Sequence, residues 1–215
     1  MKKALSALLL FIGCFTAATA QKNATVKNYK VDEKSVETTL RFLSSDELQG
    51  RDSGSEGLEK AAQYLEDVFT KNSINPYFAT YRDTLSNYPE PAYNIVGWIE
   101  GNDPELKNEF VLIGAHYDHI GVIKNEIYNG ADDNASGAAA LLQFAQYFSK
   151  NKPNNTLIFA LFDAEEMGLQ GAKAFVANPP VALDKIKLNI NMDMISHNDK
   201  QELYAVGTFK YPELK

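Results

Sequence analysis

The sequence has little cysteine, no long apolar run and no excess of basic charge. Cys14 is its only cysteine, so a mature protein cleaved after Ala20 has neither a thiol nor a disulfide. The apolar run near the N-terminus falls well short of the ~20 residues that span a bilayer, which argues against a membrane span. Lys and Arg number 21 against 28 Asp and Glu. This balance argues against a nucleic-acid partner, because phosphate binding needs clustered cations.

The N-terminus has the pattern of an export signal. Two lysines precede an apolar run at residues 4–11, and an A-x-A cleavage pattern follows at residues 18–20. We therefore predict a signal peptide at residues 1–20 and an exported protein, periplasmic or extracellular. The alternative is a lipoprotein anchored through Cys14, with residues 11–14 as an imperfect lipobox. The sequence does not specify an oligomeric state.

The rest of the chain reads as a polar leader followed by one domain. Residues 21–34 are polar and are predicted to be a flexible leader, and residues 35–215 are predicted to form a single domain without repeats or low-complexity tracts. Apolar residues with helical spacing predict an amphipathic helix at residues 57–74. A second, buried helix is predicted at residues 136–148, with Ser136 as its N-cap.

Four apolar runs of strand length lie in the second part of the chain, at residues 93–99, 110–115, 156–162 and 188–195. The middle two are nearly continuous Val, Leu, Ile and Phe, as in strands buried on both faces. Strands that alternate with helices are typical of an α/β fold. We expect a mostly parallel twisted sheet flanked by helices.

Polar residues follow these strands where each strand ends. They are His116 and Asp118, then Asp163, Glu165 and Glu166, and finally Asp193, with Asp132 and Asp133 in the loop before the second helix. In a parallel sheet the carboxyl ends of the strands share one edge, and ligands bind in the crevice there. We therefore expect these side chains to converge.

Converging carboxylates repel one another and would have raised pKa values unless a cation neutralises them. An imidazole among carboxylates suits zinc, whereas an all-oxygen set would suit Mg²⁺ or Ca²⁺. Taken singly, each residue has an ordinary explanation as a turn, a solvated acidic pair or a structural histidine. An EF-hand loop starting at Asp132 is rejected, because its twelfth position is Gln143. H-E-x-x-H, P-loop and G-x-S-x-G patterns do not occur.

Four strings carry a family resemblance. They are GAHYDHIG (114–121), NGADDNASG (129–137), DAEEMGLQG (163–171) and NMDMI (191–195). In this order they resemble metallopeptidase family 28, the secreted bacterial di-zinc aminopeptidases, from about Leu48 to the end of the chain. The resemblance implies an exopeptidase that removes N-terminal residues from peptide substrates through a metal-activated water.

The resemblance also implies a role for six residues. One zinc is held by His116, Asp133 and Asp193, and the second by Asp133, as a bridging carboxylate, and Glu166. Glu165 corresponds to the general base. Asp118 corresponds to the acid that orients His116.

The chain departs from the family pattern at one point. In the family a second His, well downstream of the position of Asp193, completes the site that includes Glu166. Here only 22 residues follow Asp193, His197 is too close to it, and His119 belongs to the first string, so both histidines are read as non-ligands. We expect a domain that is incomplete at its C-terminus, with the second zinc site one ligand short.

Alternative functions of the same fold are a glutaminyl-peptide cyclotransferase or a carboxypeptidase. A third is a non-catalytic truncated module. The strings around Asp133 and Glu165 favour the aminopeptidase over the cyclotransferase.

Overall fold

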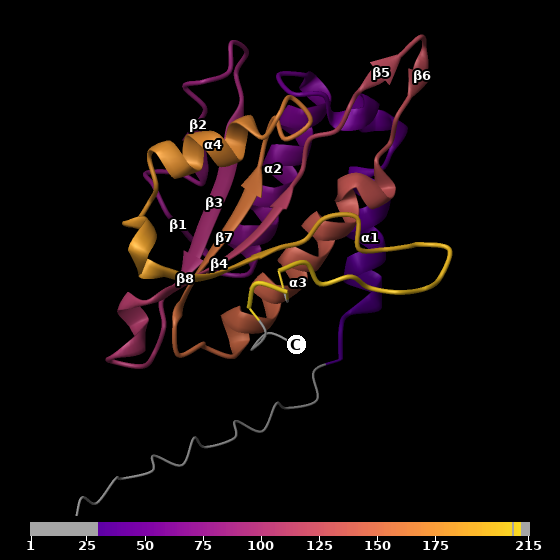
Figure 1. Cartoon of the computed structure of the whole chain (residues 1–215). Helices are drawn as coiled ribbons and strands as arrows, with labels where there is room; N and C mark the ends of the chain where they lie inside the picture. Colours follow the sequence, from indigo (N-terminus) through magenta and orange to yellow (C-terminus); the bar gives the residue numbers. More distant parts are fainter. Residues whose placement is uncertain (1–29, 208, 212–215) are drawn as a thin grey trace, which may run out of the picture. The chain divides into compact units, whose positions relative to one another are not determined.

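The computed structural model describes residues 30–207 and 209–211 (Figure 1). The predicted signal peptide, Cys14 and residues 21–29 of the predicted leader lie outside these residues. None of the helices in the described part of the chain is both long and apolar enough to cross a membrane. The account below concerns one compact unit, which starts at Val31.

Two capped helices open this unit. Helix α1 spans Glu33–Leu43, and the side chain of Asp32 caps it by accepting a hydrogen bond from the backbone N–H of Ser35. The prediction of a leader up to residue 34 is therefore wrong at its end, because this cap starts the helix earlier. Helix α2 spans Glu56–Lys71 and confirms the predicted amphipathic helix, with slightly different ends.

The main sheet has six strands. They are β1 (Asn75–Pro76), β2 (Arg82–Thr84), β3 (Tyr93–Ile99), β4 (Phe110–His116), β7 (Thr156–Phe162) and β8 (Ile186–Asn191). Their order is β1-β3-β7-β4-β8, with β2 also paired to β3. Strand β4 runs parallel to β7 and β8, whereas β3 runs antiparallel to β7. The α/β class is confirmed, with a sheet that is mixed on the β3 side.

Strand β8 differs from its predicted bounds. It ends at Asn191, so the run at residues 192–195 continues as loop. As the edge strand it leaves its apolar side chains open, with Leu188 37% and Ile190 40% exposed. Asp193 therefore lies in this loop and not in the strand, close to His116 at the end of β4.

The remaining elements include two further α-helices, α3 (Gly137–Lys150) and α4 (Gln170–Ala177). The short ones are η1 (Asp46–Arg51), η2 (Leu106–Asn108), η3 (Ala131–Ser136), η4 (Leu183–Lys185) and the hairpin β5 (Val122–Ile123) and β6 (Glu126–Ile127).

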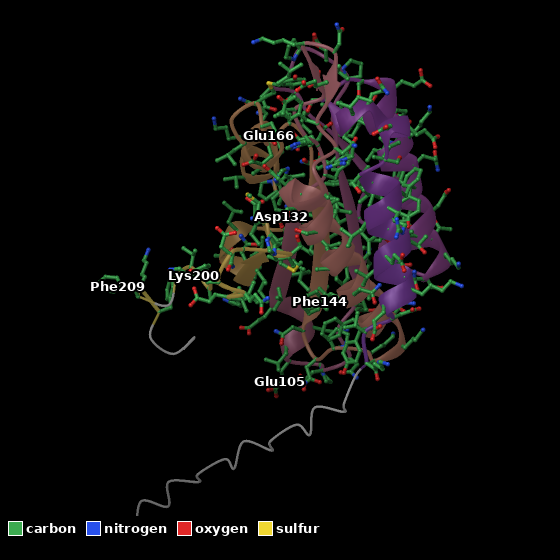
Figure 2. All side chains as sticks on the ribbon, turned by 90° about the vertical axis from the view of Figure 1, so that its right-hand side faces the viewer. Glu105, Asp132, Phe144, Glu166, Lys200 and Phe209 are labelled. Atoms are coloured by element: carbon green, nitrogen blue, oxygen red, sulfur yellow. The ribbon has the colours of Figure 1, made fainter. Side chains whose placement is uncertain are left out.

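Helices cover both faces of the sheet, with α1, α2 and α3 on one face and α4 on the other (Figure 1). Successive side chains of β7 point to opposite faces of the sheet and so contribute to the hydrophobic core on each face. Phe159 faces the α1–α3 side, and Phe162 packs with Phe175 of α4 on the other. Each fully buried side chain of this size contributes about 1.5–3 kcal/mol. On α3, Phe144 does not join this core and is 40% exposed (Figure 2), although the helix is predicted to be buried.

The start of α3 also differs from the prediction. Ser136 stands at the predicted N-cap position, but its hydroxyl donates to the carbonyl of Asp132 (2.7 Å) and makes no capping hydrogen bond. The side chain of Asn134 accepts from the backbone N–H of Gly137 (2.9 Å) in its place. The irregular η3 turn brings Asn134 into reach of that N–H. The same turn carries Asp133.

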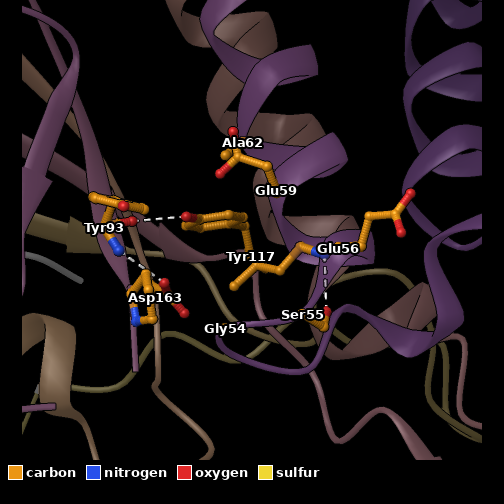
Figure 3. Close-up of a pocket in the computed structure, with 10 residues that line it drawn as sticks. Gly54, Ser55, Glu56, Glu59, Ala62, Tyr93, Tyr117 and Asp163 are labelled. Carbon is orange, nitrogen blue, oxygen red and sulfur yellow. Dashed lines mark hydrogen bonds between the residues drawn. The ribbon is translucent and has the colours of Figure 1, made fainter. Parts of the chain in front are cut away.

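The ends of β3, β4 and β7 are tied together by polar contacts (Figure 3). The hydroxyl of Tyr117 donates to the carbonyl of Tyr93 (2.7 Å), and buried Asp163 accepts from the backbone N–H of Tyr93 (2.9 Å) and from Ser53 Oγ (2.8 Å). Burial raises the pKa of Asp163 to about 6, against the opposing effect of these hydrogen bonds. A cavity of about 260 Å³ adjoins them, bordered by Gly54 among others. These contacts hold the start of β3 beside the residues that follow β4 and β7.

Candidate metal centre

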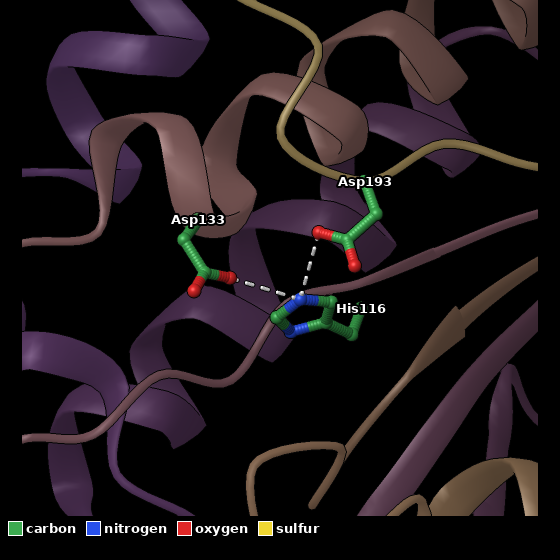
Figure 4. A group of neighbouring side chains, drawn as sticks. All are labelled: His116, Asp133 and Asp193. Atoms are coloured by element: carbon green, nitrogen blue, oxygen red, sulfur yellow. Dashed lines mark ion pairs between the residues drawn. The ribbon is translucent and has the colours of Figure 1, made fainter. Parts of the chain in front are cut away.

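His116 lies at the point where three chain segments meet. His116 is the last residue of strand β4, the η3 turn supplies Asp133, and the loop after β8 supplies Asp193. The Nε2 atom of His116 is 3.1 Å from Asp133 Oδ1 and 3.4 Å from Asp193 Oδ1 (Figure 4). The imidazole is only 3% exposed. These three residues form the first cluster.

The other nitrogen of this imidazole faces a buried carboxylate. His116 Nδ1 is 3.3 Å from Oδ1 of the fully buried Asp118. The second oxygen of Asp118 accepts a hydrogen bond from the backbone N–H of Glu166 (3.1 Å). Asp118 therefore connects the segment after β4 to the segment after β7. A carboxylate on one ring nitrogen leaves the other nitrogen directed at a metal.

The charges around His116 favour its protonated form when no cation is present. Burial lowers the pKa of His116, but the hydrogen bond and charge of Asp118, with the charges of Asp193 and Glu165, outweigh it and raise that pKa to about 9. A metal ion must displace this proton, so metal affinity at the first cluster falls as the pH decreases.

A second cluster shares Asp133 with the first and consists of His119, Asp133 and Glu166. His119 Nδ1 is 2.7 Å from Glu166 Oε1 and 4.0 Å from Asp133 Oδ2. The sequence-based interpretation set His119 aside as a member of the first string. The structure brings it beside the two carboxylates instead. His197, which was also set aside, belongs to neither cluster in the described part of the chain.

Glu165 lies beside the first cluster and belongs to neither one. It lines a cavity of about 480 Å³ together with His116 and Asp193. Burial raises the pKa of Glu165, the charge of His116 lowers it, and the charges of Asp118, Glu166 and Asp193 raise it further. A carboxylate with a raised pKa is suited to accept and return a proton.

The donor atoms of the two clusters fit zinc. Each cluster offers one imidazole nitrogen and two carboxylate oxygens, and the three donor atoms of a cluster lie within 4.8 Å of one another. Zinc accepts both donor types at ~2.0–2.2 Å, usually with four ligands. Three protein ligands leave one position open, as in catalytic rather than structural zinc sites.

Arg51 is a residue of the centre that sequence analysis did not identify. Its guanidinium is fully buried and donates to four backbone carbonyls. These are the carbonyls of Tyr117 (2.9 Å), Asn129 (2.8 Å), Gly130 (3.0 Å) and Leu43. Burial lowers the pKa of Arg51 to about 10, opposed by the charges of nearby carboxylates. One side chain thus joins the loop that carries Asp118 to the loop that carries Asp133.

We expect Arg51→Lys to destabilise the fold by several kcal/mol. A lysine presents a point charge with three donors and cannot match the planar fork of donors, so carbonyls lose their partners at ~1–3 kcal/mol each. Urea unfolding measures the change. Arg41→Lys is the matched control, because Arg41 is largely exposed and forms a surface ion pair with Glu37. Equal midpoints for the two variants would contradict the role assigned to Arg51.

The six residues predicted to form the site all lie at one edge of the sheet. The structure joins His116 to Asp133, Asp193 and Asp118, and Glu166 to Asp133 through the second cluster. No local sequence signal distinguished Arg51, since a charged residue after a Gly is more often exposed. A signal for His119 existed in its spacing of three residues from His116.

Comparison with known proteins agrees with this geometry. The sequence profile of peptidase family M28 matches residues 94–214. An aminopeptidase of Pseudomonas aeruginosa is 39% identical over 48% of the chain, and leupeptin-inactivating enzyme 1 of Streptomyces exfoliatus is 34% identical over 55%. The chain spans only 18% and 26% of the length of these two relatives.

Solved structures show the same fold. A Zn-dependent exopeptidase from Parabacteroides distasonis superposes with a TM-score of 0.64 at 22% identity, over 80% of this chain and 64% of that one. A glutaminyl cyclase from Bacteroides thetaiotaomicron gives 0.60 at 19% identity, over the same shares. The profile covers more than half of the sequence, from β3 to the loop beyond Asp193. The chain belongs to peptidase family M28.

Proposed function

We propose that the protein is a zinc-dependent aminopeptidase, with Glu165 as its general base. One observation carries the proposal: two clusters of imidazole and carboxylate donors share Asp133, and Glu165 lines a cavity together with His116 and Asp193 of the first cluster. Relatives named aminopeptidase and probable zinc metalloprotease support it. The substrates proposed are peptides with a free N-terminus.

Each residue has a distinct role in this proposal. His116, Asp133 and Asp193 would hold one zinc, and Asp133 and Glu166 the second. When bound, zinc polarises the scissile carbonyl and lowers the pKa of water toward neutrality. Asp118 is a positioning residue, because it touches His116 and the backbone of Glu166 rather than the substrate.

Glu165 would move the proton. Its carboxylate accepts a proton from the attacking water, whose oxygen bonds to the peptide carbonyl carbon. The C–N bond then breaks, and Glu165 returns the proton to the leaving amine nitrogen. The raised pKa of Glu165 favours the first of these steps, because it makes the carboxylate a stronger base toward the attacking water.

The walls of the cavity next to Glu165 support a preference for apolar substrate side chains. Beyond the polar residues of the first cluster, its walls are mostly apolar, with Leu112, Phe162 and Phe175 among them. Apolar walls of this kind favour an apolar substrate side chain over a charged one, since a buried charge needs a partner.

We expect the purified chain to hydrolyse leucine p-nitroanilide in a zinc-dependent way. Chelation should abolish the reaction and added zinc should restore it, because hydrolysis needs the metal. Aspartate p-nitroanilide is the matched comparison and should react more slowly. Hydrolysis that survives full removal of zinc would contradict the proposal.

The similarity to glutaminyl cyclases keeps one alternative in view. A peptide with an N-terminal glutamine separates the two activities. An aminopeptidase releases free glutamine, whereas a cyclotransferase closes the residue into a ring and releases ammonia with no cleavage of the peptide.

We also propose export through the N-terminal signal pattern, which mass analysis of the mature N-terminus would test.

A further inference from the structure

Glu165 lies in a closed turn between β7 and α4. The carbonyl of Asp163 accepts a hydrogen bond from the backbone N–H of Gly171 (3.0 Å), which joins the two ends of the turn. Inside it, the carbonyl of Glu165 accepts from the N–H groups of Gly168 (2.9 Å) and Leu169 (2.8 Å). Gly171 permits the closure, because a Cβ at that position would come within 2.3 Å of the carbonyl oxygen of Asp163.

The residue before Glu165 has a backbone conformation that side chains rarely adopt. Ala164 is fully buried and has a φ of +51°, in the left-handed region. A residue with a Cβ occupies this region at a cost, so the surrounding contacts must hold it there. One such contact is the hydrogen bond from the backbone N–H of Ala164 to Oδ1 of Asp163, at 2.6 Å. Hydrogen bonds to a carboxylate are shorter and stronger than those between neutral groups.

The carboxylate of Asp163 is itself anchored outside the turn. Its Oδ2 accepts from the backbone N–H of Tyr93 (2.9 Å), the first residue of β3 (Figure 3). Its Oδ1 also accepts from the hydroxyl of Ser53 (2.8 Å). The side chain is fully buried, and both oxygens have donors. Asp163 therefore connects Ala164 to β3.

The residue after Glu165 is held in a similar way. The backbone N–H of Glu166 donates to Oδ2 of the fully buried Asp118 (3.1 Å). Glu165 thus lies between two peptide N–H groups that each donate to a buried carboxylate. These contacts restrict how the backbone of Glu165 moves relative to the cavity that it lines with His116. A general base must lie within hydrogen-bond reach of the proton that it accepts, so this restriction bears on the reaction.

We propose that Asp163 is a positioning residue for Glu165, which it holds in place by keeping Ala164 in the left-handed conformation. The inference rests on the proposed function for the role of Glu165 as general base. Asp163 belongs to neither donor cluster, and it borders a different cavity from the one that Glu165 lines. Its effect on the reaction therefore passes through the turn.

The test variant is Asp163→Asn. An amide offers only one acceptor oxygen, so in either orientation its NH₂ group faces a backbone N–H and breaks the connection from Ala164 to β3. We expect kcat for leucine p-nitroanilide to fall by about 10–100-fold, since a misplacement of ~1 Å costs up to ~10²-fold. KM and zinc content should stay unchanged, because the ligands of the first cluster lie on other segments.

The matched control is Ser53→Ala. It removes one hydrogen bond from the same carboxylate but leaves both backbone contacts in place. Its urea midpoint should fall while its kcat stays at the wild-type value. A purely structural role for Asp163 would instead lower the urea midpoint in both variants and kcat in neither.

Two further measurements test whether the effect passes through Ala164. Adding Ala164→Gly to Asp163→Asn should restore part of the lost kcat, because glycine adopts the left-handed conformation readily. In the wild type, the short hydrogen bond should shift the NMR resonance of the Ala164 amide proton downfield of ordinary amides. An ordinary resonance would overturn the inference even if Asp163→Asn did not fold.

Three results with the variants would also overturn the inference. They are unchanged kcat in Asp163→Asn, loss of zinc in that variant, and no recovery of kcat when Ala164→Gly is added. Zinc-dependent hydrolysis that is lost in Glu165→Gln but kept in Asp163→Asn would leave the proposed function standing.

Discussion

Glu165→Gln is expected to lower kcat for leucine p-nitroanilide by about 10²–10⁴-fold. Glutamine has nearly the same shape but cannot accept the proton of the attacking water or deliver it to the amine. Zinc content should stay unchanged, because Glu165 belongs to neither donor cluster. Steady-state kinetics at saturating substrate, with zinc measured on the same sample, checks both statements.

The control for this variant is Glu126→Gln. Glu126 is an exposed carboxylate on the β6 hairpin strand, so its loss changes the net charge equally without touching the cavity. It should leave kcat unchanged. If Glu165→Gln kept wild-type kcat, another group would have to be the base. If it lost zinc along with activity, Glu165 would be a ligand instead.

Asp133→Asn is expected to remove metal from both clusters together. Asp133 is the one residue that they share, and an amide oxygen carries no charge to hold a cation. Zinc affinity should weaken by more than about 100-fold, beyond the range for supporting contacts, and hydrolysis should fall to background. Titration with zinc under a competing chelator measures the affinity.

The neighbouring residue supplies the matched control. Asp132 Oδ1 accepts from the backbone N–H (3.0 Å) and the hydroxyl (2.6 Å) of Ser196, and Asp132 is in neither cluster. Asparagine keeps that acceptor, so Asp132→Asn should bind zinc as the wild type does. Loss of zinc in Asp132→Asn with retention in Asp133→Asn would reverse the assignment of the two residues.

The strands and the edge that carries the site were predictable from sequence. The apolar runs at β3 and β7 match the observed strands, and His116 is the last residue of β4, where a polar residue ends a buried run. The pairing of β4 with β7, with His116 opposite Phe162, then places the following residues together. The antiparallel direction of β3 was not predictable, because strand direction is set by connections rather than by composition.

The errors lie where contacts between distant segments decide the structure. Ser136 stands at the N-cap position as predicted, yet the side chain that accepts from the backbone N–H of Gly137 is that of Asn134 in the η3 turn. The run after Asn191 is apolar enough for a strand but leaves the sheet as a loop. In both cases tertiary contacts override the local propensity of the segment.

The sequence by itself determined the α/β class and the family, because these depend on local order along the chain, and the six residues predicted for the site remain a prediction. The tertiary structure alone decided that His119 faces Glu166 and Asp133, and that Arg51 is buried against four carbonyls. These features depend on segments far apart in sequence that meet only after folding. The spacing of residues along the chain does not encode which oxygen of Asp133 faces which imidazole.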